Sequence, residues 1–362
     1  MKMPDFSLTY PQFTPWSAFC GGSLIAASAL LFLVVAGKRV GISGLISAGL
    51  LSSLRLQPLD PLATSFLSAF LVAALAAPLV FNPPPPPLLL PPTAYVLSGL
   101  LVGFGTRLGN GCTSGHGVCG LSRLSKRGAV AVITFMSVGV AIASFLGAHP
   151  HPFFRVAPPT PPASSDALDL PIPPAFWTPS VLLLAVFLLL HRLGQKTSFH
   201  PCLHLAAFLS GALFALGLAL SGMSQSLKVL DFLFLRFPGW DPSLVVVLGA
   251  AVGLLTPFSL YILSHQAVAY GDPSVKIYTP GKGPLATSQS EKVDWRLLVG
   301  EAIFGAGWGI TGICPGPALV LLAQGHRKVA LLFWPMYVGG YLLEEALERV
   351  LTRRKEDAGK KE

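Results

Sequence analysis

The chain has 362 residues, of which 52% are hydrophobic and only 11% are charged. Soluble domains carry about 25% charged residues, so this composition excludes an ordinary soluble protein. The net charge of +9 could indicate nucleic-acid binding, but the basic residues lie in short loops and in the C-terminal tail, which is typical of membrane orientation signals.

Apolar stretches long enough to cross a bilayer recur along the chain. A spanning helix needs about 20 largely uncharged residues. The N-terminal tail, residues 1–16, lacks the basic region and short apolar core of a cleaved signal peptide. Complete spans are predicted at 17–37, 60–81, 128–148, 176–191, 203–222, 243–265 and 328–346. The pattern predicts an all-α polytopic membrane protein.

Proline-rich segments divide the chain. Residues 83–92 form the first, and the second, 149–175, holds nine prolines between positions 150 and 174. Both read as extended linkers outside the bilayer. The predicted organisation is a first transmembrane repeat at 17–148, the linker at 149–175, a connector helix at 176–194, a second repeat at 203–347 and a basic cytoplasmic tail at 348–362.

The second half of the chain repeats motifs of the first in the same order. Asp60-Pro61 recurs as Asp241-Pro242, and Ile42-Ser43-Gly44 resembles Leu220-Ser221-Gly222. Farther along, one constant offset of 202 residues relates Gly103, Gly105, Cys112 and Lys126 to Gly305, Gly307, Cys314 and Lys328. The shared order indicates an internal duplication.

Charge placement predicts how the two repeats are oriented. If each half holds three complete spans and one broken span, the connector helix brings the total to nine crossings. Most basic residues then fall on the cytoplasmic side. A single connector forces the second half to enter from the opposite face, which gives inverted repeats, a common transporter architecture. We expect a multi-pass protein of the plasma membrane with its C-terminus in the cytoplasm.

Two glycine-rich segments interrupt predicted spans. Residues 103–120 contain seven glycines in 18 positions, and residues 304–317 contain Pro315 and Pro317. Glycine costs about 1 kcal/mol relative to alanine inside a helix, and proline starts a new helix well. The N-termini of the resulting half-helices, at Cys112 and Cys314, would present free amides to an anion. Alternatively, the glycines permit tight helix packing and the cysteines are small apolar fillers.

The residues around both cysteines resemble those of a known family. Gly109-Asn-Gly-Cys-Thr-Ser-Gly-His-Gly117 and Cys314-Pro-Gly-Pro-Ala-Leu319 are similar to the YeeE/YedE sulfur-transport family, and the likeness extends from about residue 20 to 341. It implies an hourglass-shaped, inverted-repeat transporter that takes up thiosulfate or a related small sulfur-containing anion, with Cys112 and Cys314 at the constriction. Where members carry a further cysteine, this sequence has Gly41, which puts a three-cysteine relay in doubt.

The candidate substrate-binding residues surround the two breaks. They are Arg107, Gly111, Cys112, Thr113, Ser114, His116, Cys314, Pro315 and Gly316. Arg107 would attract the anion or snorkel to an interface.

Several of these residues have simpler alternative roles. Thr113 and Ser114 would donate to the anion or cap the half-helix, and His116 would contact the anion or hydrogen-bond the unwound loop. Cys112, His116 and Cys119 have zinc-like spacing but no clear fourth ligand, so no metal or other cofactor is predicted.

Two other classes of function stay open beside a non-enzymatic transporter. A membrane thiol redox or sulfur-transfer protein would act with a sulfurtransferase partner, although the sequence has no C-x-x-C pair. The second class is a structural membrane subunit, a role that would not explain why both halves carry a helix break. Beyond the lipid bilayer and the anion, a sulfurtransferase and a second copy of the chain are the candidate partners.

Overall fold

The computed structural model describes residues 13–37, 39–53, 60–81, 90–148, 200–235, 240–265, 278–279, 282–284 and 292–359. These residues are helical almost throughout, apart from a short antiparallel pair, β1 (Tyr278–Thr279) and β2 (Lys282–Pro284). The all-α membrane fold is therefore confirmed. The predicted linker at 149–175 and connector at 176–194 lie outside the described residues.

The helices follow the same order in both halves. The first half contains α1 (Pro15–Ala36), α2 (Ile42–Ser53), α3 (Pro61–Phe81), α4 (Pro92–Leu108), η1 (Thr113–Gly120) and α5 (Lys126–Ala148). The second contains α7 (His200–Leu220), α8 (Ser226–Leu233), α9 (Ser243–His265), α10 (Trp295–Thr311), α11 (Pro315–Ala323), η3 (Val329–Phe333) and α12 (Trp334–Gly359). Each half contains, in order, a long helix, a short helix, a long helix, a broken pair of helices and a long helix. The shared order supports the predicted duplication.

Five of the predicted spans coincide with helices that are long and apolar enough to cross a membrane. They are α1, α3, α5, α7 and α9. In the described part of the chain, α10 and α11 together make a sixth candidate, bent by 43° at its break. The span predicted at 328–346 is the start of a longer helix that continues into a charged segment. The total of nine crossings stays a prediction.

The structure corrects one of the motif matches. Asp60 and Asp241 occupy equivalent places, because each carboxylate accepts backbone amide hydrogens at the start of α3 or α9. The match of residues 42–44 with 220–222 is wrong. The first triplet begins α2, whereas the second contains the last residue of α7, Leu220, and the turn after it. The left-handed glycine that follows α1 is Gly37, and its counterpart after α7 is Gly222.

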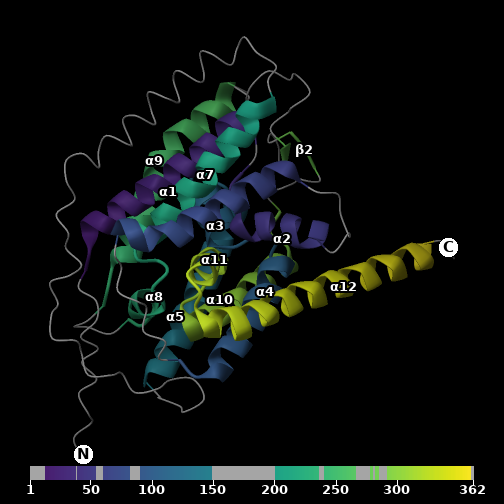
Figure 1. The fold of residues 1–362 in the computed structure, drawn as a ribbon. Helices are drawn as coiled ribbons and strands as arrows, with labels where there is room; N and C mark the ends of the chain where they lie inside the picture. The colour runs from purple at the N-terminus through teal and green to yellow at the C-terminus, as the bar shows by residue number, and fades with distance from the viewer. Residues whose placement is uncertain are drawn as a thin grey trace, which may run out of the picture.

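The long helices among the described residues form two bundles of four. The first bundle contains α1, α3, α7 and α9, and the second contains α4, α5, α10 and α12. Figure 1 shows α1, α7 and α9 side by side at one end of the molecule, with α12 extending away at the other. The short η1 packs on α5 and α9, one helix from each bundle. The short α11 packs on α3 and α7 of the first bundle and on η3, which itself contacts α4 and α12 of the second, so both short helices lie where the bundles meet. Each half supplies two helices to each bundle, and the two halves therefore interleave.

Most glycines in the two breaks serve close helix packing. A Cβ at Gly103 would lie 2.0 Å from the carbonyl oxygen of Tyr337, and one at Gly305 would lie 2.5 Å from that of Phe135. Both glycines sit inside regular helices, α4 and α10. Within residues 103–120 and 304–317, the backbone leaves helical geometry only at 109–112 and 312–314. The packing alternative thus holds for these glycines, while the breaks themselves are shorter than the sequence suggested.

Candidate functional site

Both half-helices begin at a cysteine, as the sequence predicted. Cys112 directly precedes η1 with φ −148° and ψ −170°, and Cys314 directly precedes α11 with φ −106° and ψ 172°. These are extended conformations typical of N-cap residues. Neither cysteine side chain caps its own helix. The first turns therefore keep their backbone donors for other partners.

The structure brings the two cysteine junctions into contact. The Thr113 hydroxyl donates to Cys314 Sγ at 3.5 Å, which links the first break to the second. Cys112 Sγ lies 3.2 Å from Ser114 Oγ, and that hydroxyl accepts the backbone amide of Ile42 at 3.1 Å. The two hydroxyls thus contact sulfur atoms and the start of α2. Cys112, Thr113, Ser114 and Cys314 form one cluster.

A cavity of about 90 Å³ adjoins this cluster. Both cysteines, Thr113, Ser114 and Gly316 line it. The rest of its wall is formed mainly by apolar residues from six helices: Ile25, Val118, Phe135, Met136, Phe214, Leu218, Val247, Leu248, Ala251 and Trp308. An apolar pocket with a few converging polar groups is the usual form of a small-ligand site. The cysteine cluster supplies those groups here.

The two half-helices offer different numbers of backbone donors. The first turn of η1 has the amides of Thr113, Ser114 and Gly115, whereas Pro315 and Pro317 leave α11 with the Gly316 amide alone. Pro315 therefore starts α11 but gives no hydrogen bond to a ligand. An anion in the cavity would find most of its backbone donors on η1.

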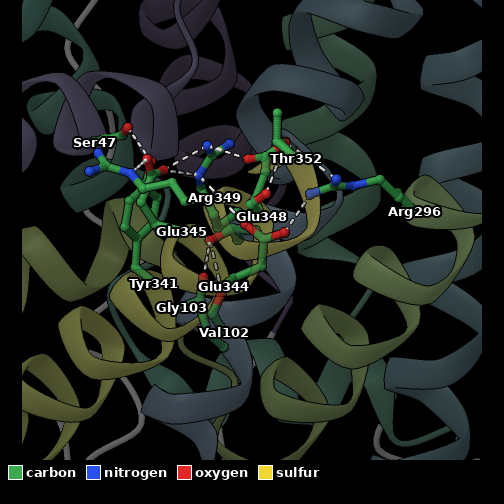
Figure 2. A network of polar contacts seen from close by, with 12 residues as sticks. Ser47, Val102, Gly103, Arg296, Tyr341, Glu344, Glu345, Glu348, Arg349 and Thr352 are labelled. Atoms are coloured by element: carbon green, nitrogen blue, oxygen red, sulfur yellow. Dashed lines mark hydrogen bonds and ion pairs between the residues drawn. The ribbon is translucent and has the colours of Figure 1, made fainter. Parts of the chain in front are cut away.

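Arg107 lies in an ion-pair network with α12. Its guanidinium contacts Glu345 and Glu348, each at 2.7 Å. Figure 2 shows these carboxylates together with Glu344, Arg296 and Arg349. Arg296 contacts Glu344 at 2.5 Å, and Arg349 contacts Glu345 at 3.0 Å. These carboxylates neutralise the charge of Arg107 in the structure. The role of Arg107 in attracting the anion stays a prediction.

His116 and Gly111 meet at the first break. A Cβ at Gly111 would lie 2.3 Å from His116 Nε2, so glycine leaves the space that the imidazole occupies. His116 Nε2 lies 3.3 Å from the Gly109 carbonyl oxygen and 3.3 Å from Glu301 Oε1. The predicted contact of His116 with the unwound loop is present.

Glu301 and the Lys228–Asp241 pair were not among the residues predicted from the sequence. Glu301 is fully buried in α10. Lys228 Nζ lies 3.1 Å from Asp241 Oδ2 and donates to Thr14 Oγ1 at 2.7 Å, with both charged side chains 1% exposed. A lone charge within an apolar segment is the signal that would have pointed to them.

The zinc alternative gains no support from the geometry. Cys119 Sγ donates to the Val40 carbonyl oxygen at 3.1 Å instead of joining Cys112 and His116. Within the ranges that the structure describes, no group of three or more His, Cys, Asp or Glu side chains could hold a metal ion.

Comparisons with known proteins match each half of the chain separately. Residues 7–142, which include Cys112, match a family described as sulphur transport. Residues 203–356, which include Cys314, match a family of unknown function, DUF6691.

Two relatives from Xylella fastidiosa strain 9a5c are each named a probable transporter. One is 38% identical over 151 residues, which is 92% of its length and 40% of this chain. The other is 35% identical over 140 residues, which is 96% of its length and 37% of this chain. Each of these relatives is similar to less than half of the present chain. Together with the apolar helices, these matches identify an integral membrane protein, and the chain belongs to the YeeE/YedE sulfur-transport family.

Proposed function

We propose that this membrane sulfur transporter takes up thiosulfate, or a related small sulfur-containing anion, through the constriction at Cys112 and Cys314. The observation that carries the proposal is the meeting of two helix breaks at these cysteines, where Thr113 contacts Cys314 beside an apolar cavity. The family match supports sulfur as the transported element.

The chemistry of the cluster suits transient binding. A thiol is a weak hydrogen-bond donor with a polarizable sulfur, so its contacts with a sulfur anion form and break at low cost. The hydroxyls of Thr113 and Ser114 and the first amides of η1 would stabilise the negative charge. Conduction requires sites that bind well enough to admit the anion and weakly enough to release it. The anion would pass from one cysteine to the other.

Uptake into proteoliposomes tests the proposal. Purified protein is reconstituted, and the entry of radiolabelled thiosulfate is compared for the wild type, Cys112→Ala and Cys314→Ala. Loss of one contact in the rate-limiting step, at about 1.4 kcal/mol, corresponds to a tenfold fall in rate. We expect each variant to reduce the uptake rate by about tenfold or more.

Two other cysteines provide matched controls. Cys20 in α1 and Cys202 in α7 are free thiols that do not line the cavity. Cys20→Ala and Cys202→Ala should transport at the wild-type rate. If wild-type liposomes accumulate no labelled thiosulfate, or if all four variants match the wild type, the proposed pathway is wrong. Competition by sulfate and sulfite then sets the substrate range.

The orientation and the partners belong to the same proposal. We place the C-terminus in the cytoplasm and the protein in the plasma membrane, because most basic residues then lie inside. A sulfurtransferase that receives the imported sulfur, or a second copy of the chain, would be the protein partner. In the alternative function, sulfur transfer at a membrane thiol, the thiolate of Cys112 or Cys314 would attack the outer sulfur of thiosulfate, break its S–S bond and release sulfite, leaving a cysteine persulfide without net uptake. Mass spectrometry of the incubated protein distinguishes the two functions.

A further inference from the structure

A buried carboxyl group lies beside the cysteine constriction and has no part in it. Glu301 is in α10, seven residues after the Asp294 cap, and its side chain is fully buried. Among the described residues, neither of its carboxylate oxygens has a hydrogen-bond partner. A buried charge without donors is strongly unfavourable, and ionisable groups inside membrane helices usually serve transport.

His116 is the titratable group in contact with this carboxyl. Its Nε2 lies 3.3 Å from Glu301 Oε1 and is itself largely buried. A carboxylate and a neutral imidazole at this distance carry a charge of −1 together, and one added proton makes the pair neutral. The pair is therefore built to hold one exchangeable proton.

Other charged groups surround the pair on the neighbouring elements. Arg127 from α5 donates to the Gly109 carbonyl at 3.5 Å. Arg39, before α2, and Arg123, after η1, add positive potential at the imidazole, and the Cys112 thiol is close enough to interact with the carboxyl. These positive charges favour the deprotonated pair, which carries a charge of −1. A divalent anion at Cys112 has the opposite effect and favours the protonated, neutral pair.

Glu301 also packs tightly against the unwound residues that precede Cys112. A Cβ at Gly109 would lie 2.5 Å from Glu301 Oε1, and one at Gly300 would lie 2.2 Å from the Gly109 amide nitrogen. Asn110 follows with a left-handed φ of 59°. A change of charge at Glu301 therefore acts directly on the unwound residues that position Cys112.

The symmetry of the chain argues against a purely structural role. At the offset of 202 residues, the counterpart of Glu301 is Gly99 and the counterpart of His116 is Ala318. Gly99 packs tightly, since a Cβ there would lie 2.4 Å from the Phe333 carbonyl oxygen. The first half therefore packs closely at this position without a carboxyl group. The Glu301–His116 pair is present in the second-half arrangement only, so the shared fold does not require it.

We propose that Glu301 and His116 form a proton-binding site that couples import of the sulfur anion to entry of protons. The inference rests on the proposed function of the cysteine constriction. Import of an anion into a negative interior is opposed by the membrane potential, and protons carried with it would offset that opposition. The deprotonated pair repels the anion at Cys112, whereas the protonated, neutral pair allows the anion to bind there. Binding of anion and proton is reciprocal, as linkage requires.

Proteoliposomes containing the full chain and an entrapped pH-sensitive dye test the coupling. When thiosulfate is added outside, we expect the lumen to acidify as the labelled anion enters. An inward proton gradient should increase accumulation, and a protonophore should abolish that increase. Thiosulfate entry without lumen acidification in the wild type would overturn the proposal, and this result needs no variant.

Glu301→Gln separates coupling from transport. We expect it to lose gradient-driven accumulation but to keep exchange of external label for internal thiosulfate, with an exchange rate that no longer varies between pH 6 and 8. Asp357→Asn, which removes an exposed carboxyl near the end of α12, is the control and should behave as the wild type. If Glu301→Gln does not fold, Glu301→Asp, which keeps the carboxyl, should retain acidification.

The outcomes also separate this inference from the proposed function. Absence of both exchange and uptake in the wild type refutes thiosulfate transport itself. Exchange by the wild type with no response to a proton gradient refutes only the proton site. A Glu301→Gln protein that still accumulates thiosulfate in response to the gradient refutes it as well.

Discussion

At the scale of single residues, two glycines of the first half, Gly41 and Gly103, have very different surroundings. A Cβ at Gly41 would meet Gly115 Cα at 3.8 Å, which is ordinary contact, whereas a Cβ at Gly103 would lie 2.0 Å from a backbone oxygen of α12. We therefore expect Gly41→Cys to change stability by no more than about 0.5 kcal/mol. Gly103→Ala should cost about 1–3 kcal/mol, because α4 and α12 must separate.

Thermal unfolding in detergent measures this contrast. The melting temperature of Gly41→Cys should match that of the wild type, and that of Gly103→Ala should fall by several degrees. Gly339→Ala is a suitable control, because Gly339 lies in α12 and a Cβ added there would meet no atom of another helix within 4 Å. Equal melting temperatures for Gly103→Ala and Gly339→Ala would contradict the close approach of the two helices.

The sequence predicted the two cysteine junctions but not the buried carboxyl group of Glu301 beside them. Cys112 lies in a glycine-rich segment, and Cys314 is followed by two prolines. The constant offset between repeated residues identifies the two cysteines as equivalent positions. Glu301 is a single acidic residue whose partner, His116, is distant in the chain. Its place within an apolar segment is a local signal, but its contact with His116 depends on how α10 packs against the first break, and no local pattern reports that contact.

At the scale of helices, α10 begins with a charged cap that should respond to pH. The Asp294 carboxylate accepts the Leu297 amide at 3.2 Å and pairs with Arg127 at 2.9 Å. Partial burial raises the pKa of Asp294, but the hydrogen bond and positive charge of Arg127 outweigh it, and the net pKa is lowered. A lowered pKa in the folded state means that the carboxylate stabilises the fold above its unfolded pKa, near 3.9.

Asp294→Asn isolates this contribution, because asparagine still caps the helix. The variant should melt below the wild type at pH 7. The difference should shrink as the pH falls through the folded pKa of Asp294, since the wild-type carboxyl then becomes neutral too. Melting curves in detergent from pH 7 down to about 3 measure it. A difference that is independent of pH would mean that the cap acts through shape and not through charge.

The long helices were predictable because the bilayer fixes their length. An apolar run of about 20 residues is a strong signal, and the predicted limits of α9 agree with the structure at both ends. The short helices α2 and α8 were missed, because 12 and 8 residues are too few to span a membrane. Their positions depend on tertiary contacts such as the buried ion pair of Lys228 with Asp241.

At the scale of the whole molecule, the interleaving of the two halves could not be predicted from the repeat alone. The repeat implies two similar units, and it would be satisfied equally by two separate bodies. In the structure α1 packs on α7 and α9, and α4 packs on α10 and α12. The buried faces of each half are therefore covered mainly by helices of the other half.

This arrangement predicts how the chain behaves when it is divided. We expect fragments 1–165 and 166–362, expressed together with different tags, to assemble in the membrane and to co-purify as a complex. Fragment 1–165 expressed alone should aggregate or be degraded, because α1 and α4 lose their partners from the second half. The relatives, each matched over nearly its full length by under half of this chain, show that proteins of about half this size exist.

Tandem affinity purification followed by size-exclusion chromatography measures the assembly, and thiosulfate uptake by the purified complex tests whether the constriction has formed. Fragments expressed separately and mixed in detergent serve as the control for association after extraction. A stable, monodisperse fragment 1–165 that does not bind the second fragment would show that each half folds as its own body. Cys112 and Cys314 could then meet only if the halves docked after folding, and the cavity that both cysteines line would not be an obligate part of the fold.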